Sequence, residues 1–120
     1  PLLLLAALVG PPMGLFFWKG NQKIDNFAQA VADDLFSYIQ PDVALQFVLG
    51  KGDIPKKKKA KIDQKFTDIR LQIKRFSESN SLGIYGKARL LKQFNDRLEE
   101  LGYDIEVVNK ITENFLIQNA

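Results

Sequence analysis

Cysteine and histidine are both absent from the 120-residue sequence. Disulfide bonds, thiol nucleophiles and imidazole bases are therefore excluded. Nearly every zinc, copper or haem site is excluded with them, because those sites use cysteine or histidine ligands. The side chains that remain for chemistry are carboxylates, lysines, hydroxyls and tyrosines. We predict no catalytic residue, no metal site and no cofactor, and we identify no small-molecule substrate.

Carboxylates placed for acid–base catalysis are also scarce. The adjacent pairs, Asp33 with Asp34 and Glu99 with Glu100, are not expected to form a dyad, because neighbouring residues of a helix point in different directions. No stretch has the spacing of a calcium-binding loop. We therefore interpret the chain as non-enzymatic. An enzyme based on lysine, carboxylate and tyrosine chemistry stays a third hypothesis, which would require a deep pocket around a desolvated group.

Only one long apolar run is present, in residues 1–18, which carry no charged side chain. As a helix, residues 2–18 would span about 25 Å, slightly less than the ~30 Å hydrocarbon core of a bilayer. The run ends in aromatic residues followed by Lys19, as at a membrane–water interface. We predict a membrane anchor in residues 1–19, made by Leu2, Leu3, Leu4, Leu5, Leu8, Phe16, Phe17 and Trp18.

Two other interpretations of this run stay open. Residues 2–9 have the length of the apolar part of a signal peptide, so the segment could be an uncleaved signal-like remnant. It could also be a buried hairpin of a soluble core. Pro11 and Pro12 predict a kink or break after Gly10.

The expected location is the membrane, with a single N-terminal anchor. Lys19 and Lys23, which follow the apolar run, favour a cytoplasmic body by the positive-inside rule. A signal-anchor of the usual type places the body on the other side. The side of the body stays open, and we prefer the periplasmic or lumenal side.

Residues 20–120 carry apolar side chains at helical spacing almost throughout and lack the alternation expected for strands. We predict an all-α fold in which the N-terminal hydrophobic anchor precedes a compact bundle of four to five helices. Pro41, Gly50 and Gly102 predict helix ends, while Asn21 and Asp104 predict helix starts as N-caps. The predicted helices cover about residues 21–40, 42–49, 57–76, 87–101 and the chain from 105 onward.

The third predicted helix has a narrow apolar stripe on an otherwise charged surface, which is typical of a helix that packs along a neighbour. The members of the stripe are Ile62, Phe66, Ile69, Ile73 and Phe76. In the break that follows, Leu82, Ile84 and Tyr85 are too apolar for a free loop, so we predict that they lie under the bundle. Phe36 and Leu71 fall outside the stripes of their helices and would mark a partner interface if exposed.

Positive charge is concentrated in residues 51–75, from Lys51 to Arg75, which hold ten basic and three acidic side chains. The rest of the chain holds seven basic and eleven acidic side chains, so the charge is strongly divided. A basic linker and helix start occupy about residues 50–61. We predict a partner- or anion-binding site formed by Lys56, Lys57, Lys58, Lys59, Lys61 and Lys65.

These observations favour a membrane-anchored helical accessory or assembly subunit of a larger membrane protein complex, which acts through protein–protein contacts. The alternative is a peripheral module that binds anionic lipid or nucleic acid through residues 51–75. The expected partners are the membrane and other protein subunits, with anionic lipid as a further candidate. Nucleic acid is disfavoured, because no aromatic residue alternates with the lysines and no recognition module is present.

Overall fold

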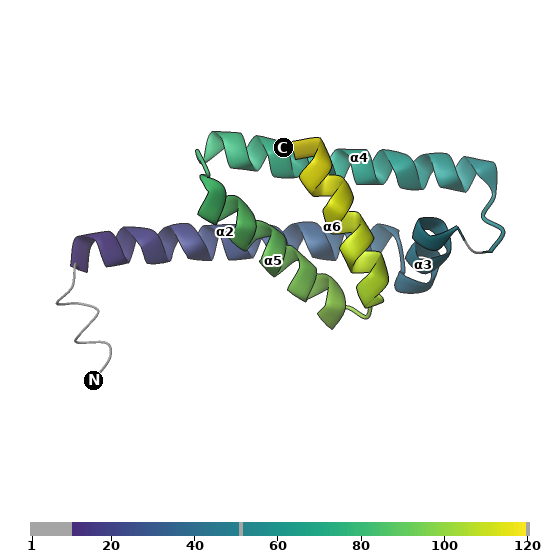
Figure 1. Cartoon of the computed structure of the whole chain (residues 1–120), viewed down its shortest axis with the longest axis horizontal. Helices are drawn as coiled ribbons and strands as arrows, with labels where there is room; N and C mark the ends of the chain where they lie inside the picture. The colour runs from purple at the N-terminus through teal and green to yellow at the C-terminus, as the bar shows by residue number, and fades with distance from the viewer. Residues whose placement is uncertain (1–10, 51, 120) are drawn as a thin grey trace.

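The computed structural model describes the backbone of residues 11–50 and 52–119 and the side chains of residues 20–50 and 52–114. Within these ranges the chain forms five helices and no strand. In chain order they are α2 (Pro11–Tyr38), α3 (Pro41–Leu49), α4 (Lys56–Ser79), α5 (Ile84–Glu100) and α6 (Ile105–Asn119). The prediction of an all-α fold is confirmed (Figure 1).

The long helix α2 packs chiefly against α5, and the two helices run in the same chain direction (Figure 1). Two ion pairs join them, Arg89 with Asp25 and Arg97 with Asp33. Both pairs link residues that are 64 positions apart, so α2 and α5 advance by the same number of residues between the two contacts. The start of α5 therefore lies near the level of residues 20–21 of α2.

Helix α4 packs against α2 in the opposite direction. Near its end, the ring of Phe76 stacks on that of Phe27, with centroids 3.9 Å apart. Nearer its start, Lys65 pairs with Asp34 further along α2. Helices α3 and α6 close the bundle, because α6 contacts α3, α4 and α5. The result is a single core between α2 and the four later helices.

The core consists mainly of aliphatic side chains supplied by all five helices. Four members of the predicted α4 stripe are buried, and Phe76 is partly buried. Phe36 is also partly buried and meets the ring of Tyr103 edge to face, so only Leu71 of the two predicted interface residues is exposed. The largest fully buried side chains are Phe94, Leu35, Ile39, Ile69, Leu90, Leu98, Val107 and Val108.

Glycines end two of the helices as predicted. Gly50 has a φ of 67° at the end of α3, and Gly102 has a φ of 101° after α5, both in the left-handed region that glycine adopts without steric cost. After α5 the Tyr103 amide donates to the Leu98 carbonyl and the Gly102 amide to the Glu99 carbonyl, which is a Schellman ending.

The start of α6 is also as predicted. The Asp104 carboxylate accepts a hydrogen bond of 2.9 Å from the Glu106 amide, in the manner of an N-cap.

Several sequence predictions are wrong in detail. Asn21 lies inside α2 and does not begin a helix, because no residue between Pro11 and Tyr38 forces the helix to end. Helix α5 begins at Ile84, three residues before the predicted start at Lys87. Ile84 and Tyr85 do not lie under the bundle: they are 92% and 55% exposed. Leu82 alone packs against the core from this break.

The N-terminal part of α2 extends past the other helices (Figure 1). Gly20 is exposed, and a Cβ atom added there would meet nothing within 4 Å. Ile24 is the first α2 side chain that is buried in the part of the chain whose side chains the structure describes. We call residues 11–20 the α2 arm and residues 21–119 the body.

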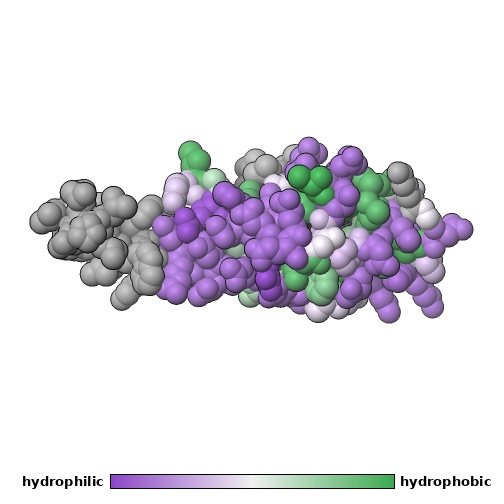
Figure 2. Space-filling model, turned by 90° about the horizontal axis from the view of Figure 1, so that it is seen from below, coloured by the Kyte–Doolittle hydropathy of each residue, from purple (hydrophilic) through white to green (hydrophobic). Residues whose placement is uncertain are grey.

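One face of the body is mainly hydrophilic (Figure 2). Small hydrophobic groups interrupt this face, and they do not join into a continuous apolar band in that view. The exposed large apolar residues of the described side chains are dispersed over four helices: Tyr38, Leu71, Ile84, Tyr85 and Ile105.

Candidate functional site

The first turn of α4 is formed by four consecutive lysines with exposed side chains, Lys56, Lys57, Lys58 and Lys59. Pro55 precedes them and supplies no side-chain hydrogen bond as an N-cap. The N-terminus of a helix carries a partial positive charge, so a cation near it costs typically ~0.3–1 kcal/mol. Exposed lysines gain little from packing, so their placement here lowers the stability of α4.

Two lysines of this run, Lys57 and Lys58, line an open groove together with Lys61. Helix α3 and the start of α4, which form the groove with the end of α2, lie at the end of the body away from the α2 arm (Figure 1). The groove has a volume of about 510 Å³ and lies between the end of α2, the first turn of α3 and the first two turns of α4. We call it the basic groove. Its lining residues are Tyr38, Gln40, Val43, Pro55, Lys57, Lys58, Lys61 and Ile62. Among the described residues no carboxylate lines it, so the lysines lie beside a mainly apolar wall.

Lys65 is placed differently from the groove lysines. Its Nζ atom lies 2.7 Å from Oδ2 of Asp34 and 5.4 Å from the centre of the Tyr38 ring. These contacts direct Lys65 toward α2 and neutralise its charge in part. The three groove lysines, by contrast, form no ion pair with any residue that the structure describes. Their charges are therefore available to a ligand.

A second cavity lies on another side of α4, between α3, α4 and α6. It has a volume of about 190 Å³ and carries both signs of charge on an apolar base. Its lining residues are Phe47, Val48, Asp63, Phe66, Arg70, Lys110, Ile111 and Asn114. This is smaller than the ~300–1,000 Å³ of typical small-molecule pockets, whereas the basic groove falls inside that range.

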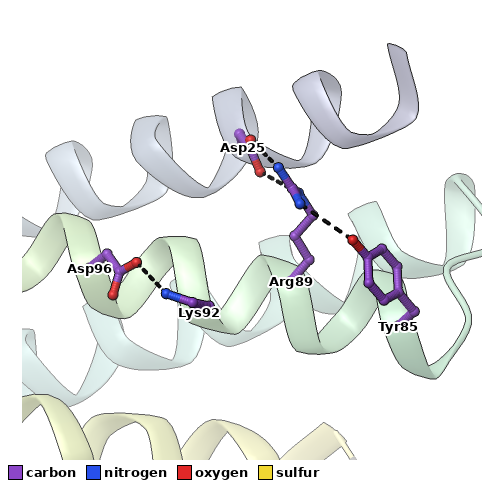
Figure 3. A network of polar contacts seen from close by, with 5 residues as sticks. All are labelled: Asp25, Tyr85, Arg89, Lys92 and Asp96. Atoms are coloured by element: carbon purple, nitrogen blue, oxygen red, sulfur yellow. Dashed lines mark hydrogen bonds and ion pairs between the residues drawn. The ribbon is translucent and has the colours of Figure 1, made fainter. Parts of the chain in front are cut away.

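Arg89 forms the main polar contact between α5 and α2 (Figure 3). Its Nε and Nη2 atoms donate to the two carboxylate oxygens of Asp25, both at 2.9 Å, and its Nη1 donates to the Tyr85 hydroxyl at 3.4 Å. The hydrogen bonds to Asp25 and then to Tyr85 raise the pKa of the guanidinium above its ordinary value. Further along α5, Lys92 pairs with Asp96 at 2.9 Å. The Arg89–Asp25 pair joins α5 to α2, so Arg89 has a structural role, whereas the exposed Lys92–Asp96 pair lies within α5.

Tyr103 fixes the end of α2. Its buried hydroxyl donates a hydrogen bond to the carbonyl oxygen of Ile39, one residue past the helix. Carbonyls at a helix C-terminus lack a helical donor, so the tyrosine supplies the missing partner. Burial raises the pKa of the Tyr103 hydroxyl. The contact orients the turn from which Gln40 and α3 enter the basic groove.

The adjacent carboxylates Asp33 and Asp34 form ion pairs with two different helices. Asp33 accepts a hydrogen bond of 2.8 Å from Nε of Arg97, and the pKa of that guanidinium is raised by Asp33 and, less strongly, by Glu100. Asp34 pairs with Lys65 on α4. The part of the chain that the structure describes contains no group of three or more acidic residues that could hold a metal ion.

All side chains of the predicted anchor, residues 1–19, lie outside the described side chains. Leu2, Leu3, Leu4, Leu5 and Leu8 lie outside the described residues. Phe16, Phe17 and Trp18 belong to the backbone of α2, in the α2 arm. Among the described residues, no helix combines the length and the apolar composition that a membrane span requires.

Five of the eight residues that line the groove were not predicted as part of a site, and one of them, Ile62, was predicted only as a member of the apolar stripe. Tyr38, Gln40, Val43 and Pro55 join the lysines because α4 packs antiparallel to α2 and places its start beside the α2–α3 turn. The sequence contains no local signal of that packing. Pro41, which predicts the turn itself, is the nearest indication that residues 38–43 meet another element.

Comparisons of the chain with protein-family models, with curated proteins and with solved structures found no match.

Proposed function

We propose that the protein is a non-enzymatic, membrane-anchored helical subunit that assists the assembly of a larger membrane protein complex. The α2 arm inserts into the membrane with the apolar residues before it, and the body binds another protein. The observation that carries the proposal is the α2 arm, which extends from the body as one continuous helix and whose residues 11–18 belong to the uncharged apolar run.

The surroundings of the arm support insertion. Residues of α5 lie beside the α2 residues that precede them by 64 positions, so Ile84 and Tyr85 lie near residues 20–21, where the arm meets the body. Both side chains are exposed although apolar or aromatic. Tyrosine is enriched at membrane–water interfaces, and lysines near an anionic leaflet gain about 1 kcal/mol each. Lys19, Lys23 and Lys87 lie at the same level.

The position of the basic groove favours a protein as its ligand over the lipid headgroups of the membrane that holds the α2 arm. From Gly20 to Tyr38, α2 rises about 27 Å at ~1.5 Å per residue. Charge interactions in solution are largely screened beyond about 8–10 Å. With the arm inserted across the bilayer, the groove lysines would lie too far from the headgroups to bind them. They would instead face a partner that stands above the membrane.

Vesicle flotation of the full chain tests the anchor. The protein would be synthesised in a cell-free system with neutral phosphatidylcholine vesicles, so that lysine attraction to anionic lipid contributes nothing. We expect the wild type to float. The double variant Leu8→Lys, Phe17→Lys should stay at the bottom, because each charge in the hydrocarbon region costs roughly 2.5–3.5 kcal/mol.

The matched control adds the same two charges to exposed positions of the body, as Gln22→Lys and Gln29→Lys. This control should float like the wild type. Flotation of the Leu8→Lys, Phe17→Lys variant after a high-salt wash would show that the apolar run is not the anchor, and the proposal would be wrong.

A further inference from the structure

We infer that the basic groove binds an acidic peptide segment of a partner protein, one that carries apolar side chains beside its carboxylates. The inference rests on the proposed function in one respect, namely that the partner of the body is a protein. It adds where the partner binds and which chemistry recognises it.

The two walls of the basic groove define the chemistry of the ligand. Lys57, Lys58 and Lys61 present three unpaired charges along one side of α4. The other lining is mainly apolar, with the buried Ile62 at the base and the half-exposed Tyr38 at the rim. A ligand that satisfies both walls needs anionic groups next to apolar ones.

The placement of the charges indicates a built binding surface. The positive end of the α4 dipole and the three lysines act together on the groove, and both favour an anion. Asp34 neutralises Lys65 outside the groove, while no described carboxylate lines the groove itself. Lys65, which packs against α2, is thus paired within the fold, whereas the three groove lysines can bind an anionic ligand.

Two other anionic ligands fit less well. Anionic lipid of the membrane that holds the α2 arm would be separated from the groove by most of the length of α2. Single-stranded nucleic acid requires a basic track with several aromatic side chains on which successive bases stack. The groove offers one aromatic residue, Tyr38, among its lining residues. An acidic, amphipathic peptide uses both walls.

Fluorescence anisotropy with synthetic peptides tests the inference on the full chain in nanodiscs of neutral lipid. The first probe is a labelled peptide of about three helical turns with glutamate and leucine residues. The second probe has serine in place of every leucine and the same charge. We expect the first peptide to bind and the second to bind about tenfold more weakly, because it cannot use the apolar wall.

Charge-matched variants identify the site. The groove variant carries Lys57→Gln, Lys58→Gln and Lys61→Gln. The control variant carries Lys74→Gln, Arg75→Gln and Lys110→Gln, which are exposed basic residues outside the basic groove and outside the lysine run. We expect the groove variant to bind the glutamate–leucine peptide about tenfold more weakly than the wild type, and the control to change less than about threefold.

A single substitution on the apolar wall adds an independent test. Tyr38→Ala removes a half-exposed side chain and should also weaken binding of the glutamate–leucine peptide.

Four results would overturn the inference. Equal losses in the groove and control variants would show attraction by net charge alone. Equal binding of the serine peptide would show that the apolar wall is unused. Absence of peptide binding would remove the site. If phosphatidylserine vesicles or oligothymidine bound more tightly than the glutamate–leucine peptide, and the groove variant lost this binding, the groove would be assigned to lipid or nucleic acid.

The outcome is separable from that of the anchor test. The groove variant should float with neutral vesicles as the wild type does, because its α2 arm is unchanged. Peptide binding can therefore fail while flotation succeeds, and flotation can fail while the groove binds its peptide.

Discussion

Reversal of charge in the first turn of α4 should make the protein more stable while it abolishes peptide binding. The variant is Lys57→Glu with Lys58→Glu. Each replacement removes a cation from the positive end of the helix dipole and places an anion there. Effects of this kind are worth about 0.3–1 kcal/mol per exposed site, and relief of repulsion within the lysine run acts in the same direction. We expect the free energy of unfolding to rise by about 1–2 kcal/mol in total.

Urea unfolding monitored by circular dichroism measures this gain, with thermal unfolding beside it. In a domain of this size, ~1 kcal/mol corresponds to a rise of roughly 4–8 °C in the melting temperature. The gain should shrink in ~1 M salt, where the Debye length falls to about 3 Å. The same variant should lose binding of the glutamate–leucine peptide, because two of the three groove lysines now repel it.

The control reverses two charges in the second half of the same helix, as Lys74→Glu with Arg75→Glu. These residues lie nearer the negative end of the helix dipole, so we expect no gain in stability and a small loss. A Lys57→Glu, Lys58→Glu variant that is no more stable than the wild type at low salt would show that the lysine run carries no electrostatic cost.

Three further predictions concern the body. Ile69→Asp should unfold the protein, because a charge would enter a fully buried position, whereas Leu71→Asp on the exposed side of α4 should leave the melting temperature within a few degrees of the wild type. Gly102→Ala should cost about 1–2 kcal/mol in urea unfolding, because alanine is strained at a φ of 101°. Burial raises the pKa of Tyr103, so its contribution to stability is complete below pH ~10 and is lost above it by about 1.4 kcal/mol per pH unit. The free energy of unfolding, measured between pH 9 and pH 11, roughly the range in which tyrosine ionises, should fall more steeply above pH ~10 in the wild type than in Tyr103→Phe. An equal fall in both proteins would contradict this prediction.

Local signals in the sequence predict much of the fold. Gly50, Gly102 and Asp104 act through their own backbone and short side chain, so their effect on helix ends does not depend on distant residues. The apolar stripe of α4 is equally local, since helical period alone places Ile69 and its neighbours on one face. These features could therefore be predicted without knowledge of the tertiary structure.

Other features depend on packing and could not be predicted. Ile84 and Tyr85 are apolar, and their apolar character alone suggested burial, yet the first turn of α5 extends past the core. The lysine run was visible in the sequence, but the separation of Lys65 from the groove lysines depends on Asp34 of α2. The apolar wall of the groove arises where α2, α3 and α4 meet, which no local pattern encodes.

A body that binds a membrane protein partner through the groove lysines should stay with that partner when it is extracted. The protein would be extracted from the native source in a mild detergent and treated with carbodiimide, which cross-links lysines to carboxylates. Size-exclusion chromatography and mass spectrometry would then identify the partner and the cross-links. We expect elution in a large assembly of fixed stoichiometry, with cross-links from Lys57, Lys58 or Lys61 to an acidic segment of another subunit. Elution as a single chain in a detergent micelle, or cross-links to the groove lysines from within this chain only, would contradict a protein partner bound through these lysines.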